Sequence, residues 1–506
     1  MAARLVAIIA ALSVAGLVIG PVAAVLLRAE AFGGFGPADW QALRFTLLQA
    51  TLSAALSVLF AIPLARALAR RRFWGRGVLV ALLGAPFILP VIVAVLGLLA
   101  VFGQSGLLNR LILAPLGLPE VQIYGLHGVL LAHVFFNLPL ATRLILQGWL
   151  AVPAEQFRLA ATLDLGCKAM WQAIEKPLLL RIVPGAFAVI FVICLSSFAV
   201  ALTLGGGPRA TTLELAIYQS MRFDFDLARA AALGLVQLAL ALTAGLVALK
   251  VSTASVAQRG LDRVVPRWDG ASTFSRLWDG FWIILAAAFL LTPLAMVVAN
   301  GLAGIAELGA SVWQAAGQSI SVALGSTLLC LIWALPLSTR WGEWLGLAGI
   351  ALSPLVMGIG LFLIVRPFVN PFELALYVTA TVNAFVSLPF VLRILRPEAE
   401  AIRTDYARLR GALGLSAWAW LRWVFLPRLK RPLGFAAGLT AALSMGDLGV
   451  IALFADPDRA TLPLKVYQLM GAYRMEQAAG AALLLLVLSL GLFWLFDRGG
   501  RVGTQA

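Results

Sequence analysis

Long apolar stretches, each about the length of a membrane-spanning helix, follow one another along the chain and are separated by short polar segments. A bilayer core needs about 20 apolar residues per helix, so these stretches predict transmembrane helices. Apolar and polar residues do not alternate with a period of two, which argues against an outer-membrane barrel. Twelve helices are expected, over residues 5–27, 43–65, 78–102, 126–149, 182–204, 228–250, 281–299, 318–338, 344–365, 372–395, 433–454 and 477–496.

The two halves of the chain repeat this order of helices in the same orientation. Near the start of each half, residues 59–63 (LFAIP) match residues 332–336 (IWALP). Residues 250–280 are basic, contain Ser, Gly and Pro, and predict a cytosolic linker. The sequence therefore predicts an all-α polytopic membrane protein with two parallel six-helix repeats, 1–265 and 272–506, related by an axis along the membrane normal.

Composition and charge agree with this class of protein and indicate its orientation. Hydrophobic residues make up 62% of the chain and charged residues 12%. A soluble protein of this length would need many more polar residues on its surface. Most of the 38 Lys and Arg residues fall in alternate loops, so the positive-inside rule places both termini in the cytosol. The basic residues adjoin helix ends instead of forming one patch, so the net charge of +15 indicates topology and not nucleic-acid binding.

A polar segment between the fourth and fifth helices occurs in both halves, at residues 151–177 and 401–427, which are 250 residues apart. The fourth helix of each half is expected to end at a basic residue, Arg143 or Arg393. A short helix should follow, and then a second short helix that a proline ends, Pro177 or Pro427. A segment of this kind on one loop would be read as an interfacial amphipathic hairpin. Its repetition at one offset favours docking to a two-fold partner.

Individual residues of the two segments have expected local roles. An acidic residue, Glu155 or Asp405, is expected in the first helical turn, where the positive end of the helix dipole stabilises its charge. Small residues leave room for close approach to another surface, and Gly414 supplies a left-handed stop. Asp164 occupies that position in the first copy; Asp tolerates this conformation, with Gly166 as an alternative stop. The candidate docking residues are Glu155, Arg158, Ala160, Ala161, Asp164, Asp405, Arg408, Gly411 and Gly414.

These two segments resemble the EAA loops of type I ABC importer permeases. The family pattern has a proline thirteen residues after the glycine, and this spacing holds from Gly414 to Pro427 and from Asp164 to Pro177. Arg158 and Arg408 depart from the pattern, since the family usually has Glu there. The resemblance implies that each loop docks into a groove of an ATP-binding subunit on the cytosolic side. A chain with both loops resembles a fused pair of permeases.

Three further stretches are similar to permeases of thiamine and thiamine-pyrophosphate importers: residues 205–219, 443–449 and 464–468. This narrower resemblance implies a multi-pass protein of the bacterial inner membrane that receives its substrate from a periplasmic thiamine-binding protein. Fused iron(III) importer permeases share the twelve-helix layout and remain an alternative. A twelve-helix secondary transporter, with residues 250–280 as its long central loop, is an alternative of a different class.

No catalytic constellation is visible in the chain. The phosphate-binding pattern G-x-x-x-x-G-K-[ST] is absent, so ATP hydrolysis is expected on a separate subunit. His127 and His133 stand six residues apart, whereas two ligands on one helix face would be three or four apart. We therefore expect a transport subunit that is not itself an enzyme, with no metal and no cofactor.

Polar residues inside the apolar stretches are the candidates for a translocation pathway. Asp447 lies in the eleventh stretch between Gly446 and Gly449. A carboxylate at mid-bilayer costs about 2.5–3.5 kcal/mol on insertion scales and normally faces a cavity or a partner. Ser197, beside Ser196, is its counterpart 250 residues earlier. The alternative for these residues is a hydrogen bond between packed helices.

Two outer segments carry a second repeated pattern, with Arg209 and Thr211 in the first half and Arg459 and Thr461 in the second. Each segment follows the fifth helix of its half. We interpret the four residues as a periplasmic gate or a docking surface for a two-lobed binding protein. A solvated loop without a function is the alternative.

Overall fold

A computed structural model describes residues 2–84, 88–207, 210–251, 272–339, 341–342, 345–346, 352–454 and 459–501. Within this part of the chain every regular element is a helix. Ten helical segments of 25 residues or more are long and apolar enough to cross a membrane, which confirms the prediction of an all-α polytopic membrane protein.

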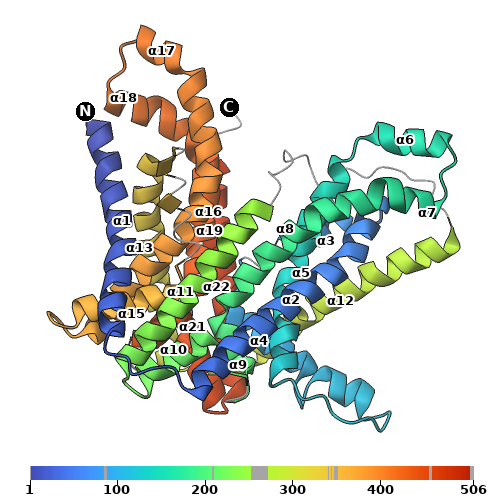
Figure 1. Ribbon diagram of the computed structural model, residues 1–506, viewed down its shortest axis with the longest axis horizontal. Coiled ribbons are helices and arrows are strands. Elements are labelled where there is room, and N and C mark those ends of the chain that lie inside the picture. The colour runs from blue at the N-terminus through green and yellow to red at the C-terminus, as the bar shows by residue number, and fades with distance from the viewer. Residues whose placement is uncertain are drawn as a thin grey trace.

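Helices of the first half precede and follow one polar loop segment that projects from the bundle (Figure 1). In chain order these elements are α1 (Ala2–Ala29), α2 (Pro37–Arg70), α3 (Arg76–Leu82), α4 (Val91–Phe102), η2 (Asn109–Leu113), α5 (Leu126–Ala151), α6 (Ala154–Thr162), α7 (Cys167–Met170), η3 (Trp171–Glu175), α8 (Lys176–Leu195), α9 (Phe198–Leu204), α10 (Leu213–Arg222) and α11 (Leu227–Val251).

Helices of the second half follow in the same order. They are α12 (Thr273–Gly304), η6 (Ile305–Glu307), α13 (Ala310–Leu337), α15 (Pro354–Val365), η7 (Pro371–Leu374), α16 (Ala375–Asp405), α17 (Ala407–Ala412), α18 (Ala417–Trp420), η8 (Leu421–Phe425), α19 (Leu426–Met445), α20 (Gly449–Phe454), α21 (Leu462–Gly471) and α22 (Met475–Arg501). The linker of the sequence analysis falls largely on residues 252–271, which lie outside the described residues.

Two of the twelve predicted stretches, the third and the ninth, form shorter apolar helices of 12 residues each, α4 and α15. A proline stands at the start of both: Pro90 is the N-cap of α4, and Pro354 is in the first turn of α15. Proline suits the start of a helix because it lacks the N–H that a longer helix would need there. Hydropathy alone extended these helices backward past their prolines.

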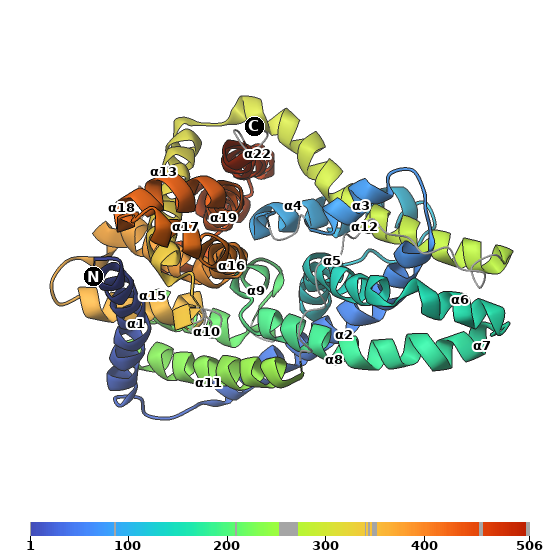
Figure 2. The same cartoon turned by 90° about the horizontal axis from the view of Figure 1, so that it is seen from above.

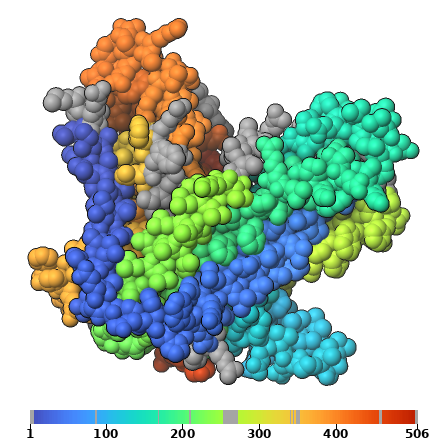
Figure 3. Space-filling view, viewed as in Figure 1, coloured from blue at the N-terminus to red at the C-terminus, as the bar shows by residue number. Residues whose placement is uncertain are grey.

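The first helix of each half packs on the other half. Helix α1 lies on α13 and α15 of the second half as well as on α11 of its own half, and α12 lies on α2 and α4 of the first half as well as on α22 of its own half. Figure 2 shows the same exchange, with α1 against α15 and α12 running past α4, and in Figure 3 the blue α1 lies against yellow and orange elements of the second half. The two halves are therefore interlocked and not simply side by side.

A glycine and a proline meet at each of these crossings. A Cβ atom on Gly97 of α4 would lie 2.6 Å from the carbonyl oxygen of Pro293 in α12. A Cβ atom on Gly360 of α15 would lie 2.5 Å from the carbonyl oxygen of Pro21 in α1. Only glycine permits backbones to approach this closely. The same pair of residue types thus fixes both crossings.

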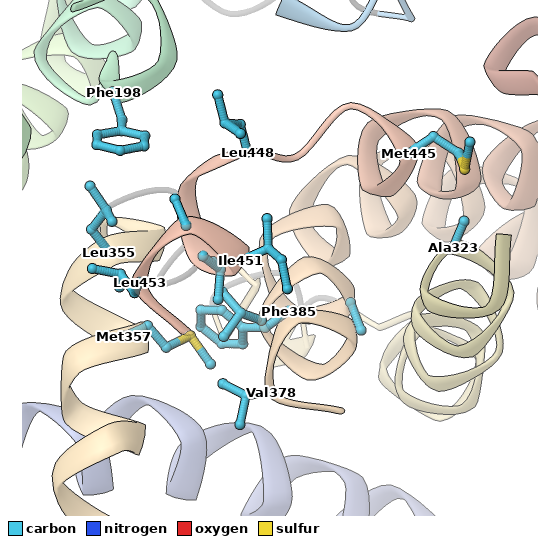
Figure 4. Close-up of a cluster of buried hydrophobic side chains, with 14 of the residues drawn as sticks. Phe198, Ala323, Leu355, Met357, Val378, Phe385, Met445, Leu448, Ile451 and Leu453 are labelled. Atoms are coloured by element: carbon cyan, nitrogen blue, oxygen red, sulfur yellow. The ribbon is translucent and has the colours of Figure 1, made fainter. Parts of the chain in front are cut away.

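The bundle diverges toward the side that carries α6 and α17, and the first residues of α1 and the last of α22 lie on this side as well (Figure 1). At the opposite side the two halves share an apolar core. Figure 4 shows part of that core, in which Phe198 of α9, from the first half, lies beside Leu355 and Leu448 of the second half.

Candidate functional site

A continuous helical segment leads from each polar loop into the middle of the bundle. In the first half α7, η3 and α8 run without interruption from Cys167 to Leu195, and in the second half α18, η8 and α19 run from Ala417 to Met445. Each segment, here called a loop rod, has 29 residues, or about 43 Å at 1.5 Å per residue. The loop and the membrane interior are thus joined by one stiff element per half.

Both loop rods contain a π-helical turn at the same place, Trp171–Glu175 and Leu421–Phe425. The prediction that Pro177 and Pro427 end a short helix is wrong, since both prolines lie in the first turn of a helix that continues. The π turn is wider than an α turn, which relieves the clash of the proline ring with the carbonyl of the preceding turn.

The short helices α6 and α17 end in the same way. Asp164 adopts φ 46° and Gly414 adopts φ 53°, both in the left-handed region. The N–H of the next residue closes the loop in each copy, Leu165 to Ala160 O at 3.0 Å and Leu415 to Arg410 O at 3.2 Å. This is the Schellman arrangement. Asp164 is therefore the stop in the first copy, and Gly166, which has no positive φ, is not.

The fourth helix of each half is longer than predicted. Arg143 and Arg393 lie inside helices that continue to Ala151 and Asp405. In the first half Pro153 ends the helix and becomes the N-cap of α6, so Glu155 stands in the first turn as expected. The second half has Arg403 at the position of Pro153 and the helix continues, so Asp405 ends α16 instead of opening α17.

Exposure separates the candidate docking residues into two groups. Glu155, Arg158, Ala161, Asp164, Asp405, Arg408, Gly411 and Gly414 are exposed. Ala160 is only 3% exposed because it packs with Phe157 and Met170 inside the loop itself. The expectation that Ala160 leaves room for another surface is therefore wrong; its small side chain fits α6 against the loop rod.

Four exposed leucines complete the surface of the two short helices, and the sequence analysis did not select them. They occupy matched positions: Leu159 and Leu163 in the first copy, Leu409 and Leu413 in the second, with exposed fractions of 43% to 62%. Large apolar side chains that recur on two projecting helices indicate contact with another protein. Their pairing at an offset of 250 residues was visible in the sequence.

The inner ends of both loop rods break at the candidate pathway residues. Helix α8 stops before Ser196 and Ser197, and α19 stops before Gly446 and Asp447; a short helix, α9 or α20, then follows. The sequence placed all these residues inside unbroken helices. The two breaks line one cavity of about 370 Å³, whose walls come from both halves.

The first break is stabilised by polar side chains from distant helices. His133 lies between Ser53, 2.9 Å from its Nδ1, and Ser197, 2.6 Å from its Nε2. Amide groups of Gln49 and Gln237 donate to the freed carbonyls of Cys194 and Leu195, at 2.8 and 2.9 Å. These bonds satisfy backbone groups that the break leaves without helical partners.

The second break places a carboxylate in the lining of the same cavity. Asp447 Oδ1 accepts a hydrogen bond from the N–H of Gly449 at 3.2 Å, at the start of α20. Its Oδ2 is buried and finds no hydrogen-bond partner among the described residues. Asn383, the counterpart of His133, donates to Ser444 Oγ at 3.0 Å. The two walls therefore match in position and differ in charge.

A second carboxylate, Glu214 of α10, also lines the cavity. It is 1% exposed and accepts hydrogen bonds from Ser353 Oγ at 2.6 Å and from Gln237 Nε2 at 3.4 Å. Among the described residues that line the cavity there is no lysine or arginine. Its polar wall is acidic or neutral throughout. The sequence analysis did not assign His133 or Glu214 to the cavity, because their partners Ser53, Ser197 and Ser353 lie 64 to 139 residues away along the chain.

The four candidate residues of the outer segments, Arg209, Thr211, Arg459 and Thr461, differ in their surroundings. Arg209 lies outside the described residues, and Arg459 donates to the carbonyl of Glu373. Thr461 is 4% exposed and precedes α21, as Thr212 precedes α10, so its structural counterpart is Thr212 and not Thr211. A buried N-cap does not offer a docking surface, so the interpretation of Thr461 as a binding-protein contact is wrong.

Matched hydrogen bonds hold these outer helices in place. The N–H of Leu213 donates to Thr46 Oγ1 at 2.8 Å, and the N–H of Leu462 donates to Ser319 Oγ at 2.7 Å. Each bond fixes the first turn of α10 or α21 to the second long helix of its half. Within the described residues there is no group of three or more His, Cys, Asp or Glu side chains arranged to hold a metal ion.

Proteins of known name resemble this chain over nearly its full length, whereas none of the protein-family models matches it. Thiamine transport system permease protein ThiP of Brucella abortus is 40% identical over 494 residues, which cover 94% of this chain and 91% of the relative. The protein of the same name from Escherichia coli is 40% identical over 488 residues, 92% and 90% of the two chains.

A shorter relative matches only half of the chain. Transport system permease protein PhnV of Salmonella paratyphi A is 26% identical over 245 residues, which cover 46% of this chain but 88% of the relative. One half of this chain thus corresponds to almost the whole of a smaller permease.

Proposed function

We propose a function from one premise: the chain belongs to the family of thiamine transport system permease proteins. It is the membrane-spanning subunit of an ATP-driven importer and forms the pathway for thiamine or its pyrophosphate. Its two repeats, 1–265 and 272–506, act as a fused pair of permeases. It lies in the bacterial inner membrane with both termini in the cytosol.

ATP hydrolysis belongs to separate subunits in this proposal. Two ATP-binding subunits bind α6 and α17 on the cytosolic side, and a periplasmic binding protein delivers the substrate on the other side. The full-length relatives favour thiamine over the iron(III) alternative, and a secondary transporter would not need two matched loops. The half-length match of the PhnV relative supports the fused pair.

One observation carries the proposal: each loop is joined by a stiff 29-residue rod to the wall of the same cavity. The two groups of helices diverge toward the loops (Figure 1). When the ATP-binding subunits close, they bring α6 and α17 together, and the rods turn about their inner ends. Ser197 and Asp447 lie just beyond those ends, so the turn changes access to the cavity from the two sides.

The chemistry of the cavity fits an aromatic cation. Thiamine carries a quaternary thiazolium ring, and the free oxygen of Asp447 provides a counter-charge. Phe136, Phe198 and Phe390 also line the cavity, and aromatic faces attract organic cations. No basic side chain of the described lining opposes the charge.

Uptake of labelled thiamine into proteoliposomes tests this function. The full chain is reconstituted with its ATP-binding subunit, and binding protein is added outside. We expect uptake that depends on ATP and on the binding protein. Uptake of iron(III) with the same ATP dependence, and no uptake of thiamine or its pyrophosphate, would overturn the assignment.

Docking is tested by placing a charge on the exposed leucines of the two short helices. Leu159→Glu together with Leu409→Glu should abolish most co-purification of the ATP-binding subunit, since each buries a carboxylate in a contact. Gln104→Glu, which adds a carboxylate on the opposite side of the membrane, is the control. Full retention by the double variant would show that α6 and α17 do not form the contact.

The cavity is tested by Asp447→Asn, which keeps the shape and removes the charge. We expect normal docking of the ATP-binding subunit and thiamine uptake reduced roughly tenfold, the effect of about 1.4 kcal/mol. Ser197→Ala, at the matched position, should reduce uptake less. Thiamine pyrophosphate is measured separately because its phosphates add negative charge. Unchanged uptake of both forms would make Asp447 a packing residue.

A further inference from the structure

We propose that one exposed face of the second loop rod binds the headgroups of anionic phospholipids. The face, here called the tryptophan–arginine face, consists of Trp418, Arg422, Trp423 and Arg431. Trp418 and Trp423 are 68% and 70% exposed, and Arg422 lies 5.3 Å from the ring centroid of Trp423. The buried side chains of the same rod, Trp420, Phe425 and Leu429, point the other way into the protein.

The position of this face fits the membrane surface. Helix α18, which begins the rod, lies near the N-terminal end of α1 in both ribbon views (Figures 1 and 2). The apolar span of α1 begins at Leu5, so that end marks where the hydrocarbon begins. Tryptophan side chains prefer the headgroup level, where the ring is half in lipid and the N–H is in water.

Charge favours an anionic headgroup over a zwitterionic one. Residues 401–431 contain seven basic and one acidic residue, whereas residues 151–181, the matched segment of the first half, contain four basic and three acidic. Among the described residues no carboxylate pairs with Arg422 or Arg431. Clusters of basic residues beside the cytosolic end of a transmembrane helix attract anionic lipids.

The first half provides an internal control. The positions that match the tryptophan–arginine face are Lys168, Gln172, Ala173 and Arg181. This set has two basic residues but no aromatic ring, although the helices that carry it have the same lengths and the same π turn. The proposed site is therefore specific to the second half.

Tryptophan fluorescence of the full chain in lipid nanodiscs tests the proposal. Brominated phosphatidylglycerol and brominated phosphatidylcholine are compared as quenchers at the same mole fraction. Wild type should show stronger quenching by the anionic lipid. Trp418→Phe with Trp423→Phe should remove that difference, because these two rings contribute the lipid-selective signal.

Charge removal distinguishes a lipid site from a protein contact. Arg422→Gln with Arg431→Gln should lower the apparent affinity for phosphatidylglycerol roughly tenfold or more, since each basic residue near the surface contributes about a fivefold effect. Lys168→Gln with Arg181→Gln, the matched control, should leave it unchanged. Equal quenching of wild type by both lipids would overturn the proposal. So would loss of the ATP-binding subunit from the Arg422 and Arg431 variant with its lipid preference intact, which would assign the face to that subunit.

Discussion

The two loop rods have the same length and the same π-helical turn, but different chemistry holds their outer ends. In the first half Glu175 is fully buried and pairs with Arg66 of α2, with N–O 2.9 Å. In the second half Phe425 stands at the position of Glu175, and Arg403 lies 5.2 Å from the centroid of its ring. At this position one half has an ion pair between a buried carboxylate and a partly exposed arginine, and the other half has a cation–π contact.

Neighbouring contacts extend this difference. Asp279 of α12 accepts from Arg70 and from Arg71, both at 2.7 Å, and so fixes the end of α2 to the crossing helix. In the second half Arg410 stacks on Trp420 at 5.3 Å and Arg428 on Tyr406 at 4.3 Å. The comparison shows that the helical geometry is repeated in the two halves, whereas the interactions that stabilise it differ. The buried carboxylate of Glu175 depends on a charged partner, whereas the apolar ring of Phe425 at the same position does not need one.

The largest difference between the halves should appear when the buried carboxylate is removed. Glu175→Gln removes the charge that faces the partly exposed Arg66 and should lower the free energy of unfolding by about 2–3 kcal/mol, within the range for a hydrogen bond to a charged group. Phe425→Leu at the matched position should cost about 1 kcal/mol, since it conserves most of the apolar volume. Denaturant unfolding in lipid–detergent micelles measures both. Equal losses would show that the two joints are energetically equivalent.

A smaller effect is expected at the stops of α6 and α17. Asp164→Val and Gly414→Val each force a β-branched residue to φ near +50°, which costs about 1–2 kcal/mol. Because both residues adopt the left-handed conformation, we expect comparable damage at the two sites. Retention of the ATP-binding subunit by each variant is the measurement, with Thr162→Val, at the last residue of α6, as the control. Damage confined to Gly414→Val would show that docking through α6 does not depend on the stop at Asp164.

The smallest effect is expected when these two residues are exchanged. Asp164→Gly should stabilise the end of α6 by up to about 1 kcal/mol, and Gly414→Asp should weaken the end of α17 by a similar amount. Hydrogen exchange of the Leu165 and Leu415 amides, which close the two loops, reports the change as up to roughly fivefold in protection. Changes of the same sign at both sites would contradict a conformational origin.

Features that depend on local chemistry could be predicted from the sequence. Ten spans follow from apolar length alone, and the left-handed stop follows from residue types that tolerate positive φ. The repetition of the loop could also be found in the sequence, because matched positions in the two copies are 250 residues apart. The prolines at the starts of α4 and α15 indicate that these helices begin there. The sequence analysis placed their starts earlier because it relied on hydropathy.

Features that depend on distant residues could not be predicted. The apolar run continues through Ser196 and Ser197, and the hydrogen bonds that stabilise the break come from His133, Gln49 and Gln237 on distant helices. The sequence analysis considered His133 only as a metal ligand. Its partners, Ser53 and Ser197, could not be recognised because they are far away along the chain. The burial of Ala160 depends on how α6 folds back onto Met170, and a sequence pattern does not give that orientation.

The crossing of α1 onto the second half has a consequence for biosynthesis. Helix α1 ends at Ala29, while α11, the first helix on which it packs, begins at Leu227, and α15 begins only at Pro354. At about 5–20 residues per second, α1 waits roughly 10 to 40 seconds for α11 and roughly 15 to 65 seconds for α15. It must persist in lipid without these partners until α11 is made, which its apolar surface and its internal backbone hydrogen bonds allow. The order of translation thus places the greatest demand for independent stability on the first helix.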